Sequence, residues 1–371
     1  MQKYLKNRSK KFKTEKHLLL KKQSNKNSFE KPEYYIKNKF ILLVFIIIII
    51  ILSILVLHLY RRLNKAKLFI KIFKVLKNEK DVDLFLNNKT DFYFQKRVKY
   101  LSKNGFYYNE SNLKTFQEKL NYLMIHESPE YKTDIADKIK VHEYSKKVLG
   151  KDICPPILKI YDNADEINLD ELPDKFALKC NHGSSMNIFC VDKSKFNLEK
   201  AKSQLNDWVN TNYGLNNREF QYIFIKKKIF AAPYLGDNII DYEIYCFNGK
   251  PKFVRVRQLL NQIRHISLHN YYDFDWKLME LETGLPNYKR DPNKKIEKPK
   301  NLNLMIEYSK KLTKDFVFVR VDFYELNNTV YLSEITFSPS NTLMKLGNEE
   351  QRLNLGSLLD ITKIKKSLFN K

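Results

Sequence analysis

Hydrophobic positions follow three different spacings along the chain. Residues 40–57 are apolar except for Ser53. Residues 116–126 and 131–148 carry apolar side chains at helical spacing, whereas short alternating or continuous apolar runs from residue 157 to about 338 predict strands between helices. The pattern therefore predicts an α+β protein with mixed sheets behind an apolar N-terminal segment.

The element boundaries follow from these runs and from turn residues. Asn248 and Gly249 separate two strand patterns and favour a type I′ hairpin turn. Residues 79–115 are polar and turn-rich, and predict helical pieces joined by loops. Helices are also predicted at 198–210 and 302–312, and strands at 157–161, 176–180, 187–191, 223–232, 239–247, 252–257, 316–324 and 329–339.

The apolar segment predicts a membrane-spanning helix. Residues 40–60 would cover a hydrocarbon core of ~30 Å at ~1.5 Å per residue. A cleaved signal peptide would have a shorter apolar region and a small-residue cleavage site, whereas Arg61 and Arg62 follow here. We therefore expect a single-pass membrane protein.

Charge is concentrated on both sides of this segment. The net charge is +25, from 67 Lys+Arg and 42 Asp+Glu. Residues 1–39 and 61–80 hold most of the excess, which argues against nucleic-acid binding and leaves the orientation open. Residues 66–78 carry lysines on one helical side and apolar residues on the other. They predict a helix on an anionic membrane surface or an ordinary stalk helix.

The cysteines and histidines give no recognisable metal motif. The four cysteines, at positions 154, 180, 190 and 246, lack C-x-x-C spacing and predict small buried side chains. His265 and His269 are four residues apart and could share a helical face. We expect the histidines to be exposed or hydrogen-bonded.

The first motif with chemical potential is F-A-L-K-C-N-H-G-S-S, residues 176–185. An apolar strand leads from Lys179 to a turn of Gly183, Ser184 and Ser185. Backbone N–H groups, hydroxyls and an ammonium suit a polyphosphate. The alternative is an ordinary strand lysine followed by a hairpin turn.

The second motif joins F-V-F-V-R-V-D-F-Y to T-V-Y-L-S-E-I-T-F-S-P. Strand alternation puts Arg320 and Asp322 on one face, and Glu334 and Thr336 on one face of the next strand. Two carboxylates suit Mg²⁺. A two-residue turn at Asn327–Asn328 would place the carboxylates on opposite faces, whereas a three-residue loop or a bulge would bring them together. The alternative is an exposed polar face with an Arg–Asp pair.

The third motif is K-I-F-A-A-P-Y-L-G-D, residues 228–237. Its strand end could offer backbone groups to a purine, with Asp237 available to a ribose hydroxyl. A plain core strand and turn is the alternative.

In this order, the three motifs resemble the TupA-like ATP-grasp family, which is associated with teichuronopeptide and cell-surface polysaccharide biosynthesis. The resemblance covers residues 115–360 and implies an ATP-grasp fold, with two α+β subdomains around the nucleotide. The matching stretches are residues 116–123, 131–144, 172–184, 241–253, 272–278, 297–301 and 318–339.

The resemblance also implies roles for individual residues. Lys179 would bind phosphate under a flexible loop of Gly183, Ser184 and Ser185, and would act in catalysis with Arg320, which lies beside the reacting phosphoryl group. The nucleotide base and ribose would be read by Ala232, Leu235 and Asp237. The Mg²⁺ ligands would be Asp322, Glu334 and Thr336.

Four departures from the family pattern bear on catalysis and on the acceptor. Ser185 stands where glycine is usual, and Ala232 replaces an acid. Glu243 replaces a common Lys, and Ser340 with Asn341 replaces glycines. These changes keep open a degenerate module that binds nucleotide or glycan without turnover.

The expected function is an ATP- and Mg²⁺-dependent carboxylate–amine ligase that works through an acyl phosphate in cell-surface polysaccharide or glycopeptide biosynthesis. A glycosyltransferase-type glycan assembly enzyme is the second enzymatic alternative. The expected partners are ATP, a carboxylate-bearing sugar or amino acid, and the membrane through residues 40–60.

The expected organisation has five segments. A basic tail (1–39) precedes the membrane helix (40–60), and a basic stalk and helical lead-in (61–114) leads to the ATP-grasp domain (115–360) and a basic C-terminal tail (361–371). The use of ATP slightly favours a cytosolic domain.

Overall fold

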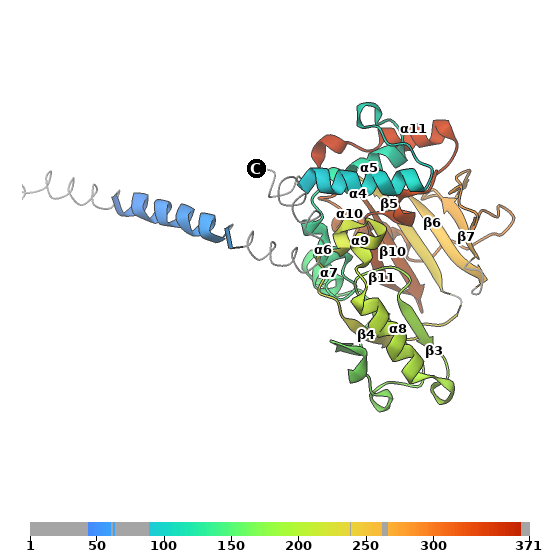
Figure 1. Ribbon diagram of the computed structural model, residues 1–371. Helices are drawn as coiled ribbons and strands as arrows, with labels where there is room; N and C mark the ends of the chain where they lie inside the picture. Colours follow the sequence, from blue (N-terminus) through green and yellow to red (C-terminus); the bar gives the residue numbers. More distant parts are fainter. Residues whose placement is uncertain (1–43, 61, 64–88, 238, 262–265, 365–371) are drawn as a thin grey trace, which may run out of the picture. The chain divides into compact units, whose positions relative to one another are not determined.

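The computed structural model describes residues 44–60, 62–63, 89–237, 239–261 and 266–364. The chain divides into two parts, Met1–Phe69 and Ile70–Lys371 (Figure 1). The predictions for the tail 1–39, for residues 66–78 and for His265 lie outside the described residues.

The first part contributes a helix over residues 44–60, whose side chains are all exposed. Across the described ranges, no helix has both the length and the apolar character needed to cross a membrane. This finding contradicts the predicted single-pass membrane localisation, and the expected membrane partner loses its support.

The second part carries the helices and strands of the globular fold. Its helices are α4 (Lys89–Lys103), α5 (Phe116–His126), α6 (Glu130–Ala136), α7 (Val141–Leu149), α8 (Leu198–Asn210), α9 (Tyr213–Asn217), α10 (Leu302–Leu312) and α11 (Glu349–Ser357). Its strands are β1 (Lys159–Tyr161), β2 (Phe176–Cys180), β3 (Asn187–Cys190), β4 (Ile229–Pro233), β5 (Ile240–Phe247), β6 (Lys250–Asn261), β7 (Ile266–Tyr272), β8 (Leu278–Met279), β9 (Tyr288–Lys289), β10 (Phe318–Leu326) and β11 (Thr329–Thr336).

Most of the predicted elements are present near their expected residues, with three local differences, whereas β7, β8, β9 and α11 were not predicted. The helix expected over 131–148 is split, because the Asp137 carboxylate accepts the N–H of Ile139 at 2.8 Å and ends α6. The strand expected from Ile223 begins only at Ile229, after a 3₁₀ turn over Phe220–Tyr222. His269 lies on strand β7, so the suggested helical face is wrong.

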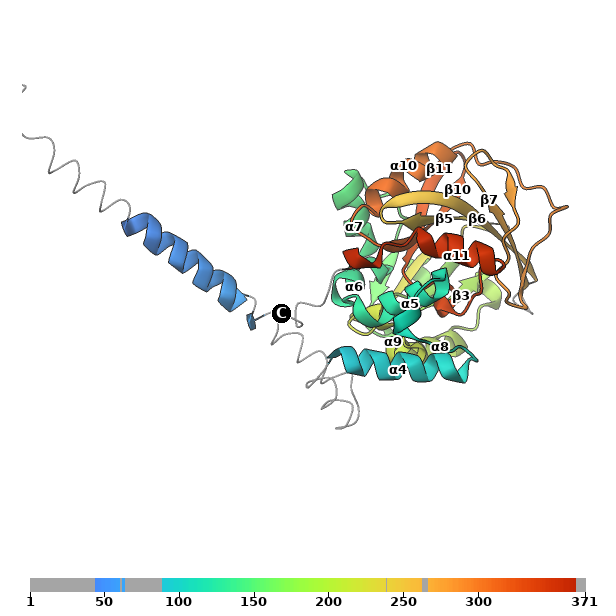
Figure 2. The same ribbon diagram turned by 90° about the horizontal axis from the view of Figure 1, so that it is seen from above.

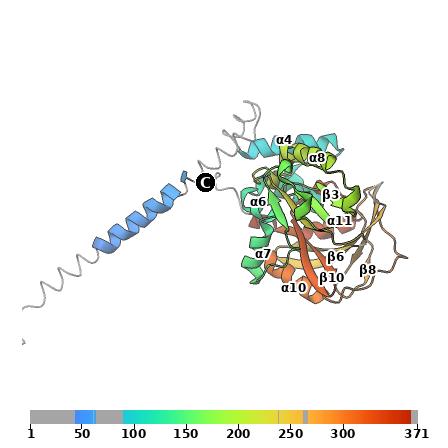
Figure 3. The ribbon, with the colours of Figure 1, turned by 90° about the horizontal axis from the view of Figure 1, so that it is seen from below.

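The strands form two sheets. The small sheet is antiparallel with the order β1-β4-β2-β3, and α8 lies beside it (Figures 1 and 3). The large sheet has the order β11-β10-β5-β6-β7-β8, and β9 adds to β7 in parallel. Asn248 and Gly249 form the predicted β5–β6 turn with positive φ at both positions.

The large sheet is covered differently on its two faces. Figure 2 shows it between α10 on one side and α5 with α11 on the other. Val319, Val321 and Phe323 of β10 pack in the core with α10. Phe318 points the other way, toward α5 and α11, so strand alternation puts Arg320 and Asp322 on that second face.

Helix α4 sends Arg97, which is fully buried, to the loop that follows β11. Its guanidinium donates to the Asn341 carbonyl and side-chain oxygens at 2.6 Å each, and to the Asn121 side chain at 3.0 Å. Ser340, Asn341 and Thr342 all have positive φ. Three consecutive left-handed residues without glycine are costly, and the contacts of Arg97 hold them in place.

Candidate functional site

A β-bulge brings the two predicted metal carboxylates together. The β10–β11 turn has only two residues, Asn327 and Asn328, both with positive φ. The register shifts by one between Asp322 and Phe323, so that Ser333 is the extra residue on β11. Asp322 therefore lies directly opposite Glu334, and the two carboxylates are on the same face of the sheet.

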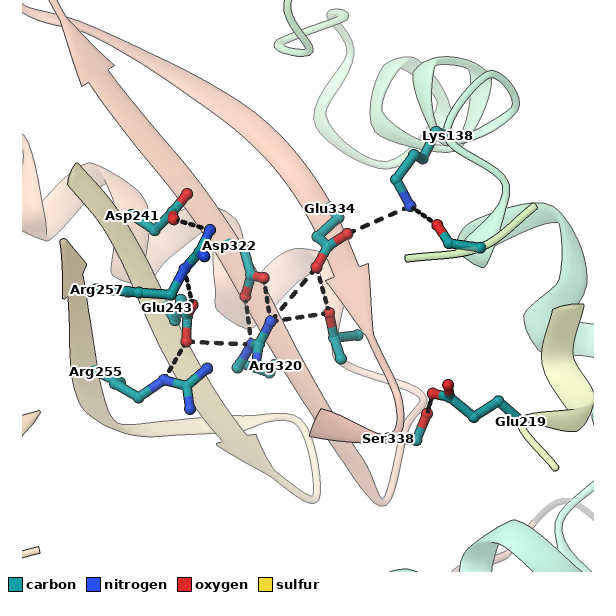
Figure 4. Close-up of polar contacts among 12 residues, drawn as sticks. Lys138, Glu219, Asp241, Glu243, Arg255, Arg257, Arg320, Asp322, Glu334 and Ser338 are labelled. Atoms are coloured by element: carbon teal, nitrogen blue, oxygen red, sulfur yellow. Dashed lines mark hydrogen bonds and ion pairs between the residues drawn. The ribbon is translucent and has the colours of Figure 1, made fainter. Parts of the chain in front are cut away.

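Arg320 joins the carboxylates on this face (Figure 4). Its Nε and Nη2 donate to the two oxygens of Asp322 at 2.7 and 2.5 Å, and Nη2 also reaches Glu334 at 3.5 Å and Thr336 Oγ1 at 3.3 Å. Burial raises the pKa of Asp322 well above its usual range; the Arg320 charge opposes the shift and Glu243 adds to it. The Arg320 guanidinium thus contacts both carboxylates at once.

Glu243 of β5 lies at the centre of a second group of charges. It forms ion pairs with Arg255, with Arg257 at 3.3 Å and with Arg320 at 3.5 Å. Burial alone would raise its pKa, but the three guanidinium groups lower it to about 2. Asp241 pairs with Arg257, and burial raises the pKa of Asp241 to about 6. Both ion-paired acids stand in the same face of the sheet as Arg320 and Asp322.

Lys138, in the linker between α6 and α7, connects the carboxylates to the small sheet. Its Nζ donates to the Gly183 carbonyl at 2.7 Å and lies 3.5 Å from Glu334 (Figure 4). Burial would raise the pKa of Glu334, but Lys138 and Arg320 lower it to about 2. The Glu334 side chain keeps about a third of its surface, 35%, exposed.

The loop after β2 is shaped by small residues. A Cβ on Gly183 would lie 2.8 Å from the Tyr213 ring, so only glycine fits there without displacing the ring. Ser185 has φ 59°, and Ser184 and Ser185 are both exposed. Lys179 stands on β2 before the loop, and burial followed by the nearby Lys138 charge lowers its pKa.

A buried acid ties this loop to the strand end beyond the carboxylates. Glu219 accepts a hydrogen bond from Tyr213 at 3.0 Å and one from Ser338 at 2.5 Å. Burial raises the pKa of Glu219, and the bonds from Ser338 and Tyr213 oppose that shift. The Gly183 loop and the β11 end therefore share two connections, one through Lys138 and one through Glu219.

The predicted base-reading residues lie at the end of β4. Ala232 is buried and pairs with Ala177, two positions along β2 from Lys179. Leu235 is half-buried, and Asp237 is exposed and accepts a hydrogen bond from Tyr234. The structure thus puts this segment beside the strand of Lys179, while no contact joins it to Asp322 or Glu334 among the described residues.

Sequence reasoning did not assign three of these groups. Lys138 lies in a stretch that resembled the family but carried no motif, and Glu243 was noted only as a departure. Glu219 and Tyr213 fell between predicted elements. Glu243 is an ionisable residue inside an apolar strand, where a buried charge needs a partner. This is the sequence signal that could have indicated the cluster.

The arrangement suits a divalent cation of the hard type. Two carboxylates on neighbouring strands face each other, with the Thr336 hydroxyl 3.2 Å from Glu334. Oxygen donors of this kind match Mg²⁺, which also keeps waters and phosphate oxygens. Both oxygens of Asp322 accept hydrogen bonds from Arg320, so a cation that binds there competes with the guanidinium for them.

Comparison with known proteins gives one broad match and several distant ones. The chain is similar to a D-alanine–D-alanine ligase from Bacillus anthracis, with 16% identity, 62% of this chain and 67% of that chain covered, and a TM-score of 0.34. An L-amino acid ligase from Bacillus licheniformis is 12% identical, with 56% of this chain and 44% of that chain covered and a TM-score of 0.34. A biotin carboxylase from Campylobacter jejuni is 10% identical, with 75% of this chain and 52% of that chain covered and a TM-score of 0.34. The search of curated proteins finds no match.

The broad match is to a family model described as TupA-like ATPgrasp, over residues 118–360. That range contains both sheets, the Gly183 loop and the β10–β11 carboxylates, whereas the likenesses to solved structures are too distant to add to it. The chain therefore belongs to the TupA-like ATP-grasp family.

Proposed function

We propose that this protein is an ATP- and Mg²⁺-dependent ligase that activates a carboxylate as an acyl phosphate and joins it to an amine, in the assembly of a cell-surface polysaccharide or glycopeptide. The observation that carries the proposal is the pairing of Asp322 and Glu334 across the bulge, with Arg320 between them and Lys138 leading to the Gly183 loop. The biosynthetic setting rests on the family alone.

The proposed reaction has two steps. A substrate carboxylate oxygen attacks the γ-phosphorus of ATP, the bond from that phosphorus to the β–γ bridging oxygen breaks, and ADP leaves. The amine nitrogen then attacks the acyl carbon, the acyl C–O bond breaks, and inorganic phosphate leaves as the nitrogen loses its proton.

The residues divide the work by charge. Asp322, Glu334 and Thr336 would hold Mg²⁺, which shields the charge on the phosphate oxygens. Lys179, Lys138 and the backbone of the Gly183 loop would bind the phosphates. Arg320 would turn from Asp322 toward the phosphoryl group in transfer, so that one guanidinium serves the resting cluster and the transition state.

The test is calorimetric titration of ATP with Mg²⁺ into the full chain and into an Asp322→Asn/Glu334→Gln variant. We expect Mg²⁺-dependent binding in the parent protein and its loss in the variant. Glu325→Gln is the matched control, because Glu325 is also on β10 but caps the backbone of Lys300 and Asn301 at 3.0 Å. Binding that survives the double substitution would refute the proposed site.

Turnover separates the ligase from the alternatives. A ligase releases ADP and phosphate only when both a carboxylate and an amine acceptor are supplied. Mg²⁺-ATP binding without phosphate release across a panel of amino sugars, uronic acids and amino acids would favour the degenerate binding module. Release of a nucleoside diphosphate from a sugar nucleotide would favour the glycosyltransferase.

A further inference from the structure

A second group of ligand-type side chains lies on the other face of the large sheet. It consists of His142 on α7, with Asp152 and Cys154 in the segment that leads from α7 toward β1, and one potential ligand atom from each lies within 4.8 Å of the other two. Cys154 belongs to the core that contains Val321 and Phe323, whose side chains leave β10 opposite to Asp322. This group is therefore separate from the proposed Mg²⁺ site.

We propose that His142, Asp152 and Cys154 bind a borderline divalent transition-metal ion, with Zn²⁺ as the natural occupant. The donor set is one imidazole nitrogen, one carboxylate oxygen and one sulfur. Thiolate and imidazole favour zinc over magnesium, and three protein ligands leave a fourth position for water.

The three side chains are already held close together. His142 Nδ1 lies 2.7 Å from Asp152 Oδ2, and the other oxygen, Oδ1, accepts the backbone N–H of Cys154 at 2.9 Å. The backbone N–H of Cys154 therefore holds the Asp152 carboxylate next to the Cys154 side chain. A metal ion would replace the imidazole–carboxylate hydrogen bond and draw in the sulfur.

The backbone around the group is fixed to both neighbouring elements. The fully buried Ser145, one turn after His142 on α7, accepts the N–H of Ile153 at 3.2 Å and donates to the Lys151 carbonyl at 3.3 Å. The Ile153 carbonyl accepts the N–H of Leu332 on β11 at 2.8 Å. Ligands on such a support lose little freedom when a metal binds, which favours affinity.

Access also differs among the three ligands in a useful way. The side chains of His142 and Asp152 are 19% and 40% exposed, whereas Cys154 is 9% exposed. An ion can therefore enter from solvent through the imidazole and carboxylate, and the sulfur closes the site from the core side.

The test uses the full chain, treated with a chelator and then titrated with Co²⁺ alone. We expect one bound ion per chain that shows a sulfur-to-cobalt charge-transfer band, and we expect Zn²⁺ to displace it. The band should vanish in Cys154→Ser and persist in Cys190→Ser, a matched replacement of another buried cysteine. Because the Asp322–Glu334 site offers only oxygen, cobalt bound there cannot produce the band.

A second variant guards against a folding defect in Cys154→Ser. His142→Gln changes a partly exposed side chain, and we expect it to weaken Zn²⁺ binding by at least about tenfold, since even outer contacts of metal ligands cost that much. A parent protein without the sulfur band, a band that survives Cys154→Ser, or an unchanged Zn²⁺ affinity in His142→Gln would each overturn the proposal.

Discussion

The Gly183 loop and the Arg320 cluster deal with charge in opposite ways. In the loop, Ser184 and Ser185 are exposed. In the cluster, Glu243, Arg255 and Arg320 are almost fully buried, and each charge has an opposite partner. A phosphate can therefore add contacts at the loop, whereas any ligand of the cluster has to replace contacts that already exist.

Because of this difference, the Arg320 cluster contributes to folding stability, whereas the exposed residues of the Gly183 loop can be changed at little cost to it. Removing one member of a buried ion pair leaves the partner unpaired in the protein interior, which is more costly than the net value of the pair. Exposed small residues carry no such cost. We expect substitutions in the cluster to act on folding and binding together, and substitutions of the exposed loop serines to act mainly on binding.

The largest effect is expected from Arg320→Met. It leaves Asp322 and Glu243 short of a buried cation, and should lower the free energy of unfolding by about 3–5 kcal/mol in urea titrations. Lys311→Met, at an exposed ion pair with Glu307, should change it by less than about 0.5 kcal/mol. Similar values for the two variants would mean that the cluster does not stabilise the fold.

The bulge can be tested by moving one carboxylate by one position. The swap Ser333→Glu/Glu334→Ser keeps the composition but takes the carboxylate away from Asp322, and should weaken Mg²⁺-dependent ATP binding by about a hundredfold, as the loss of a charged ligand implies. Deletion of Ser333 removes the bulge and leaves Glu334 opposite Asp322 in regular pairing, so binding should survive. Calorimetry on both variants checks this, and the reverse order would contradict the role of the bulge.

The two regions should lose stability in different pH windows. Burial lowers the pKa of His182 in the loop to about 4, below its usual 6.5, so its contribution is complete above pH 6.5 and is lost as the pH falls toward 4. The pKa of Glu243 is about 2, against a usual 4.5, so its contribution is lost only as the pH falls from 4.5 toward 2.

Urea unfolding from pH 7 to pH 3 can separate these contributions. His182→Gln should reduce the change in the free energy of unfolding between pH 6.5 and pH 4 by about 2 kcal/mol. Glu243→Gln should reduce only the change below pH 4.5. Asp241 has a raised pKa, so its contribution to stability changes with pH in the opposite direction. Subtracting the free energy of unfolding of the parent protein from that of each variant at the same pH removes this contribution. An upper window that His182→Gln leaves unchanged would contradict the assignment.

The smallest effect is expected at Ser185, which has a left-handed backbone without being glycine. Ser185→Gly should stabilise the protein by less than about 1 kcal/mol. The relief of backbone strain favours the folded state, but the greater freedom of the unfolded glycine chain offsets part of that gain. Ser184→Gly relieves no such strain, and should be neutral or destabilising in the same thermal unfolding measurement. Equal shifts for the two variants would show that the loop stores no strain at Ser185.

Local sequence patterns predicted the elements well where one physical rule dominates. Strand β2 and helices α8 and α10 have the predicted bounds, since the apolar spacing in each is uninterrupted, and Asn197 also caps α8 by accepting the N–H of Lys200. The two faces of β10 also follow from alternation. The break between α6 and α7 was not predicted, because a side-chain bond from Asp137 competes with the helix there.

Pairing across the chain was harder to predict than the elements. A bulge has no single-residue signature, so the sequence left open whether Asp322 meets Glu334. Lys138 is far from both Gly183 and Glu334 in sequence, and only the packed fold brings them together. The apolar residues 40–60 predicted a membrane span on composition, but no helix in the described part of the chain is both long and apolar enough to cross a membrane.

The buried guanidinium of Arg97 bears on where the working unit begins. Helix α4 lies before residue 118, at which the family match starts, yet Arg97 binds Asn121 and the Asn341 backbone inside the matched range. A fragment trimmed to the matched residues would lose the cation that holds three left-handed residues in place. Proteolysis between α4 and α5 should therefore give two pieces that stay associated, and the smallest autonomous module of this protein extends back through α4.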